Sequence, residues 1–294
     1  MDSREYIFIY VLKTNSDIPA DYPPEFRSFP FEAGVFLPQD GSNWFTRPPK
    51  YPARLLLLAE RSLHIIPHPT SAESPVDIKL DDLLQLEAGT ALLRGWLRFT
   101  TPDRIYEIVY NTRASRPLEN FLIALKRRWL GDSHSFRTFT AVESYGDRLD
   151  IKFNNSVHFE LDQEEAILVQ YFQAPIRIDK RFLFFRRENW RAGNVLLLTS
   201  MNRLVWITDE YRRRRELYAS VSFSAPLRLM RKCRVESNPG EQQRIAIQFA
   251  SLIDWHISIS GERDACSSFC QRINRISEDA GHEYSPVKNF AEEY

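Results

Sequence analysis

Basic residues that could bind phosphate gather in one part of the chain. The 294 residues include 39 basic and 39 acidic ones, so the formal net charge is zero. Between Arg177 and Arg234, however, there are 15 basic residues and only 5 acidic ones. Nine of these basic residues form two clusters: Lys180, Arg181, Arg186, Arg187 and Arg191, and then Arg212, Arg213, Arg214 and Arg215. Guanidinium groups pair with phosphate oxygens through parallel hydrogen bonds, so the clusters indicate an anion-binding site.

Several partners would satisfy such clusters. An anionic membrane surface attracts them, and so does a nucleic-acid backbone. Nucleic acid is disfavoured, because few aromatic residues are spaced as the base-stacking platforms of an exposed sheet. The clusters can also be a solvated edge that nearby acids such as Glu188 and Glu210 neutralise. Trp190, inside the first cluster, is either a core residue or a membrane wedge that enters the headgroup layer.

Other residues that could do chemistry do not form a recognisable site. The sequence contains no G-x-S-x-G, G-x-x-x-x-G-K-[ST], H-E-x-x-H or C-x-x-C motif, so no enzymatic activity and no cofactor are expected. His64 and His68 would lie about 13 Å apart on a strand, too far to share a metal. Cys266 and Cys270 lie four residues apart on a helical pattern with apolar neighbours, so we expect buried, reduced thiols without metal.

The elements that would position the basic clusters repeat along the chain. Segment 55–66 (LLLLAERSLHII) and segment 195–207 (VLLLTSMNRLVWI) both read as two apolar strands around a polar turn. Segments 105–110 and 254–259 match in the same order. Each copy then ends in apolar residues at helical spacing: Leu118, Phe121, Leu122 and Leu125, and later Cys266, Phe269, Cys270 and Ile273. This pattern predicts helices at about 115–130 and 263–277, each with one buried face.

The second of these strand pairs suggests a family. Residues 196–207 (LLLTSMNRLVWI) resemble the LLLT-x-x-x-RL-hydrophobic strand pair of bacterial pleckstrin-homology-like and GRAM-like domains. The first copy departs from the motif. Ala59 stands where the second copy has Thr199, the turn is one residue shorter, and Ser62 stands in place of Arg203.

The resemblance implies a fold and a domain division. It implies a mainly β (α+β) protein of two tandem pleckstrin-homology-like β-sandwich or barrel domains, each closed by a C-terminal α-helix. The first domain would span residues 1–132. The second would span 133–294 and end in an acidic tail from residue 278. In that topology both basic clusters would occupy loops at one open end of the second domain.

The expected function is binding. Domains that look like these bind lipid headgroups, peptides or other proteins and are rarely enzymes. We expect the second domain to recognise an anionic partner, with a protein-interaction scaffold as the alternative and nucleic-acid backbone binding as a further one. No apolar window is long enough to span a membrane, the N-terminus lacks signal-peptide features, and three cysteines form no disulfide framework. These features predict a cytoplasmic protein that can associate peripherally with a membrane.

Overall fold

The protein is mainly β, as predicted. In the computed structural model, the described residues are 8–39, 51–91, 94–112, 115–131, 160, 167–173, 176–182, 185–192, 195–200, 202–209, 219–236, 243–250, 254–258 and 263–283. The described strands pair antiparallel, and no sheet closes on itself among them. Segment 134–165, apart from Glu160, and the acidic tail beyond residue 283 lie outside the described residues.

The first half of the chain builds a five-stranded sheet in sequence order. Its strands are β1 (Tyr10–Leu12), β2 (Ala33–Leu37), β3 (Arg54–Leu58), β4 (Ser62–Pro67) and β5 (Val76–Lys79). Short helical turns lie between and after these strands: η2 (Asn15–Asp17), α1 (Pro24–Arg27) and η3 (Leu80–Asp82). Strand β3 is buried along its whole length, which explains its unbroken leucine run.

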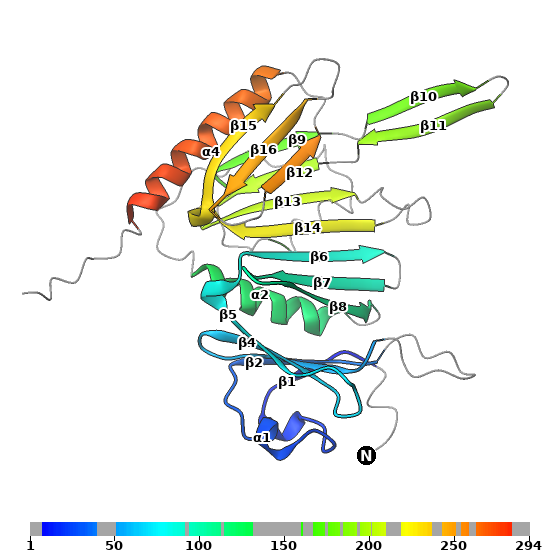
Figure 1. Ribbon diagram of the computed structural model, residues 1–294, viewed down its shortest axis with the longest axis vertical. Coiled ribbons are helices and arrows are strands. Elements are labelled where there is room, and N and C mark those ends of the chain that lie inside the picture. Colours follow the sequence, from blue (N-terminus) through cyan, green and yellow to red (C-terminus); the bar gives the residue numbers. More distant parts are fainter. Residues whose placement is uncertain are drawn as a thin grey trace, which may run out of the picture.

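A seven-stranded sheet crosses the middle of the molecule in the order β8-β7-β6-β14-β13-β12-β9 (Figure 1). Its strands from the first half are β6 (Gln85–Ala91), β7 (Arg94–Thr100) and β8 (Ile105–Asn111). Those from the second half are β9 (Val169–Gln173), β12 (Val195–Thr199), β13 (Arg203–Asp209) and β14 (Ala219–Pro226). Strands β15 (Met230–Glu236), β16 (Arg244–Phe249) and β17 (Asp254–Ser258) form a separate three-stranded sheet after the turn η5 (Leu227–Leu229).

One long helix follows the strands of each half. Helix α2 (Arg116–Leu130) and helix α4 (Arg263–Glu283) confirm the two predicted helices. The predicted apolar faces are buried, from Leu118 to Leu125 in one core and from Cys266 to Ile273 in the other. Neither helix, within the described part of the chain, combines the length and apolar character of a membrane span.

The two halves are joined edge to edge, which the sequence did not predict. Strand β6 of the first half pairs with β14 of the second, from Leu86 opposite Ser224 to Ala91 opposite Ala219. The halves therefore share one continuous sheet, although separate domains were expected. The predicted boundary between residues 132 and 133 lies outside the described residues.

The shared sheet presents opposite faces to the two cores. Leu86 and Ala88 of β6 belong to the first core. Glu87 lies between them and so on the opposite face, directly across from Phe223 of β14. Phe223 packs against the second core, stacked on Trp206 with ring centroids 4.5 Å apart. The face of the shared sheet that carries Leu86 and Ala88 therefore covers the first core, and the opposite face, which carries Phe223, covers the second core.

Candidate functional site

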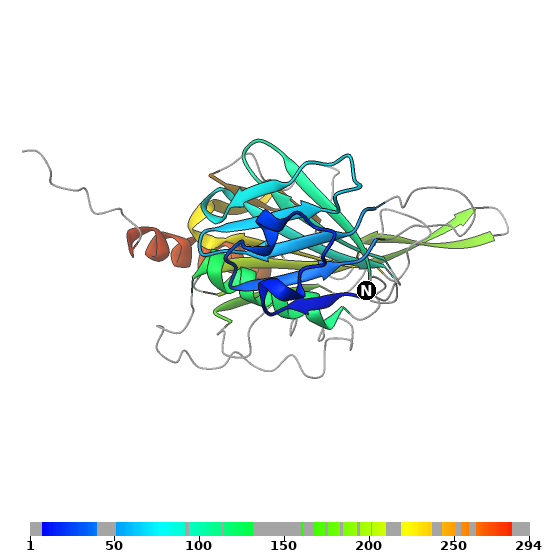
Figure 2. The ribbon, with the colours of Figure 1, turned by 90° about the horizontal axis from the view of Figure 1, so that it is seen from below.

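The first basic cluster lies on a two-stranded antiparallel ribbon. Strands β10 (Ile176–Phe182) and β11 (Phe185–Ala192) pair with each other and with no other described strand. The ribbon leaves the seven-stranded sheet between β9 and β12 and projects away from the rest of the molecule in both views (Figure 1 and Figure 2). The residues expected in a loop therefore stand on paired strands, and only 183 and 184 separate the two strands.

The register of the ribbon opposes like charges. From the turn inwards, the opposed pairs are Phe182 with Phe185, Arg181 with Arg186, Lys180 with Arg187, Asp179 with Glu188, Ile178 with Asn189, and Arg177 with Trp190. Two basic pairs and one acidic pair thus follow one another along the ribbon. Like charges directly opposite each other destabilise an antiparallel pair. An isolated two-stranded hairpin is also only marginally stable in water.

Arg191 and Trp190 lie at the base of the ribbon. The register shifts between Ile176 and Arg177, so that Arg177 opposes Trp190 and Ile176 opposes Ala192. Arg191 is the extra residue of this irregularity and stands opposite no residue. Trp190 is thus at the end of the ribbon that adjoins the sheet, five residues from the tip.

The second basic cluster, Arg212 to Arg215, lies outside the described residues. The ends of the strands that flank it are described. Gln173 pairs with Val195, and Val195 pairs with Thr208. The base of the ribbon and the C-terminal end of β13 therefore lie at the same end of the seven-stranded sheet, on neighbouring strands. The convergence of the two clusters, which the family resemblance implied, stays a prediction.

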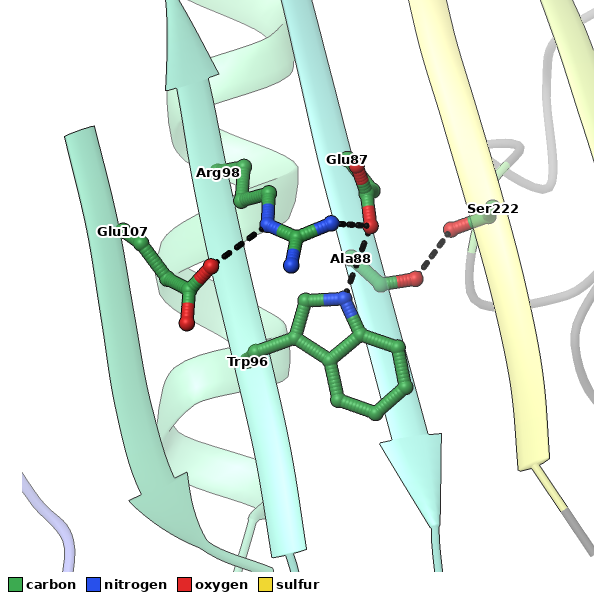
Figure 3. A network of polar contacts seen from close by, with 6 residues as sticks. All are labelled: Glu87, Ala88, Trp96, Arg98, Glu107 and Ser222. Atoms are coloured by element: carbon green, nitrogen blue, oxygen red, sulfur yellow. Dashed lines mark hydrogen bonds and ion pairs between the residues drawn. The ribbon is translucent and has the colours of Figure 1, made fainter. Parts of the chain in front are cut away.

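A second polar group lies on the outer face of β6, β7 and β8 (Figure 3). The Trp96 indole donates to Glu87 Oε1 at 2.8 Å, and Arg98 bridges Glu87 and Glu107 at 2.9 and 2.7 Å. Burial lowers the pKa of Arg98, but Glu107 and Glu87 outweigh burial and raise it. The carboxylates neutralise the arginine, so this group fits a structural role.

A buried ion pair was not found from the sequence. Lys126 Nζ of α2 donates to Glu160 Oε2 at 2.6 Å, and both side chains are at most 3% exposed. The hydroxyls of Ser222 and Ser224 on β14 donate to the same carboxylate at 2.5 and 2.9 Å. The group therefore ties α2 and residue 160 to the second half. The one signal was Lys126 next to Leu125 on an otherwise apolar helix face.

The histidines and cysteines form no metal-binding group in the described parts of the chain. No group of three His, Cys, Asp or Glu side chains there can hold a metal. His64 Nε2 lies 2.7 Å from the hydroxyl of Ser62, and His68 Nε2 lies 2.6 Å from Asp21. Cys266 and Cys270 are buried, as predicted.

Cys270 has a partner that the helical spacing did not suggest. Its Sγ lies 2.9 Å from Sγ of Cys233 on β15, and all three cysteines are free thiols. The hydrogen bond from Cys233 lowers the pKa of Cys270, and the same bond with burial raises that of Cys233.

Comparison of the chain with protein-family models and with curated proteins found no match. The candidate site is thus defined by its own residues and geometry. We take it to be the basic ribbon, β10–β11, at the end of the shared sheet.

Proposed function

We propose that the protein is a non-enzymatic binding protein whose basic ribbon recognises an anionic partner. The observation that carries this proposal is the register of β10 and β11. Arg181 opposes Arg186, and Lys180 opposes Arg187, so two like-charged pairs follow each other along the ribbon, one on each of its faces. A phosphate-bearing partner would relieve their repulsion and would form charge-assisted hydrogen bonds with the guanidinium groups.

We further propose that the two halves are divergent pleckstrin-homology-like units. The repeated order of elements supports this. The first half runs β3, β4, β5, η3, β6, β7, β8, α2, and the second runs β12, β13, β14, η5, β15, β16, β17, α4. The backbone N–H of Leu80 donates to Arg61, and that of Leu227 donates to Asn202 at the equivalent place. The ribbon is an addition to the second unit, which therefore carries the binding function.

Vesicle flotation at several salt concentrations tests the binding. Wild-type protein should float with vesicles of phosphatidylserine and phosphatidylcholine, and binding should weaken steeply as salt rises. Lys180→Ser with Arg187→Ser should weaken binding by about 25-fold, at about fivefold for each basic residue near an anionic surface. Asp179→Ser with Glu188→Ser is the matched control. It removes the acidic pair and should leave binding unchanged or strengthen it.

The expected pattern requires intact folding, so the melting temperature of each variant should match wild type. Equal binding by the wild type and the Lys180/Arg187 variant would overturn the proposal. Absence of binding to vesicles and to a soluble polyanion such as heparin would favour the protein-interaction scaffold instead.

A further inference from the structure

We propose that the tip of the ribbon, at Phe182 and Phe185, enters the interfacial layer of an anionic membrane. This inference rests on the proposed function, and it names the anionic partner as a lipid bilayer. It also assigns the inserting residues, which are not the tryptophan that the sequence suggested.

The ribbon is sorted by distance from its tip. The apolar pair, Phe182 and Phe185, is the outermost described pair, and the two residues that join the strands are Leu183 and Phe184. The next two pairs toward the sheet are basic, and the acidic pair comes only after them. From the tip inwards, the apolar pair would therefore meet the hydrocarbon boundary, the basic pairs would meet the lipid phosphates, and the acidic pair would remain in water.

The spacing of these pairs matches the layers of a bilayer surface. A strand rises about 3.4 Å per residue, so the basic pairs stand about 3 and 7 Å behind the tip and the acidic pair about 10 Å behind it. Apolar groups of interfacial proteins are buried about 5–10 Å into the headgroup and acyl boundary. An inserted tip therefore leaves Arg186 and Arg187 at the level of the phosphates, where long basic side chains reach water or phosphate.

Trp190 fits insertion less well. It stands five residues behind Phe185, about 17 Å along the strand. If the ribbon entered end-on as far as Trp190, it would carry two basic pairs and one acidic pair into the acyl region, where charges are costly. The register of the ribbon thus favours Phe182 and Phe185 over Trp190 as the inserting residues.

A soluble phosphate ligand or a nucleic acid does not account for the apolar pair. Either partner would need the basic pairs alone. A bilayer uses both groups, because the apolar tip and the basic pairs contact successive layers. The position of the tip, which projects away from the sheets, gives it access to a flat surface (Figure 1 and Figure 2).

An environment-sensitive NBD fluorophore measures the depth of each position. Cys233, Cys266 and Cys270 are at most 4% exposed, so a thiol reagent should modify an added ribbon cysteine selectively under native conditions. Phe185→Cys reports on the tip, and Trp190→Cys is the matched control at the base. With phosphatidylserine vesicles we expect a blue shift and increased emission for the tip label and little change for the base label. A response of the base label alone would overturn the inference.

A second pair of variants separates this inference from the proposed function. Phe182→Ser with Phe185→Ser should weaken vesicle binding at least tenfold, because even partial burial of a phenylalanine is worth about a factor of ten. The same variant should bind heparin as wild type does. Lys180→Ser with Arg187→Ser should weaken binding both to vesicles and to heparin. If the phenylalanine variant binds vesicles as wild type does, tip insertion is wrong while the proposed function stands. If the charge variant retains both, the proposed function is wrong.

Discussion

Asn274 in α4 makes two hydrogen bonds to the backbone of Cys233 in β15. Its Oδ1 accepts from the Cys233 N–H at 2.8 Å, and its Nδ2 donates to the Cys233 carbonyl at 2.9 Å. Cys233 lies on the edge of the three-stranded sheet that β16 does not cover. The Asn274 amide thus forms hydrogen bonds with the backbone N–H and carbonyl of an edge strand, as a neighbouring strand would. The equivalent strand of the first half, β6, is instead covered by β14.

This relationship predicts a stability effect. Asn274→Ala leaves a part-buried backbone N–H and carbonyl without these partners and should lower the free energy of unfolding by about 1–3 kcal/mol. Asn274→Asp keeps an acceptor for the N–H but loses the donor, so it should fall between the two. Urea unfolding followed by circular dichroism measures both. Equal stability of the alanine variant and the wild type would contradict the assigned role.

Replacement of Cys266 by alanine should lower the free energy of unfolding only slightly. Its side chain is 0% exposed in the second core, and its replacement by alanine removes a small volume. We expect Cys266→Ala to cost about 1 kcal/mol, measured by the same unfolding experiment. Elemental analysis of the purified protein should find no stoichiometric zinc, and its presence would refute the assignment of these thiols to the core.

Gly89 in β6 should tolerate no side chain. It lies directly opposite Trp96, and a Cβ atom placed on it would stand 2.0 Å from the indole ring. The indole is held over the glycine by its hydrogen bond to Glu87. Gly89→Ala should therefore destabilise the protein by about 1–3 kcal/mol through overpacking. Gly131, with nothing within 4 Å of its Cβ position but a φ of 85°, is a comparison in which any loss reflects backbone strain alone. Melting curves of the two alanine variants distinguish the two causes.

The periodic elements were predictable, and the contacts between them were not. The spacing of Leu118, Phe121, Leu122 and Leu125 identified α2 because one buried face fixes a helical period. Nothing in β14 marked it as the partner of β6. Its residues Val221, Phe223 and Ala225 alternate as those of any half-buried strand do, and pairing depends on which edges meet. The sequence therefore indicated the repeat but not the shared sheet.

The sequence predicted the positive charge of the candidate site but not its two-stranded structure. Arginine and lysine interrupt the alternation of segment 176–192 so often that it read as a loop. The register could not be derived, because it depends on the position of the turn between Phe182 and Phe185. Glu160 was missed for a related reason: its contact with Lys126 spans 34 residues and leaves no local pattern.

The Lys126–Glu160 pair predicts a large mutational effect. Glu160→Leu leaves the Lys126 ammonium buried without this counter-ion, so it should cost about 3–5 kcal/mol. The double variant Lys126→Met with Glu160→Leu removes both charges and should recover much of that loss. Glu107→Gln, at a carboxylate 43% exposed, is the surface control and should cost at most about 1 kcal/mol. A double variant no more stable than Glu160→Leu would show that the charge imbalance is not the cause.

The same carboxylate should shape the response to acid. Burial raises the pKa of Glu160, but Lys126 and the hydroxyl of Ser222 outweigh burial and hold it below the ordinary value of 4.5. The native protein thus binds this proton less readily than the unfolded chain does. The resulting stabilisation is complete above pH 4.5 and is lost as the pH falls through the lowered native pKa.

Urea unfolding between pH 3 and 6 tests this dependence. Glu160→Gln cannot titrate, so its free energy of unfolding should fall less steeply below pH 4.5, by up to about 1.4 kcal/mol per pH unit. Asp17→Asn is the matched control: the backbone N–H groups of Thr14 and Lys13 lower the pKa of Asp17, which lies at the surface. Asp17→Asn should reduce the pH dependence of the free energy of unfolding less than Glu160→Gln does. Parallel curves for wild type and Glu160→Gln would mean that the buried carboxylate takes up its proton as readily in the native protein as in the unfolded chain.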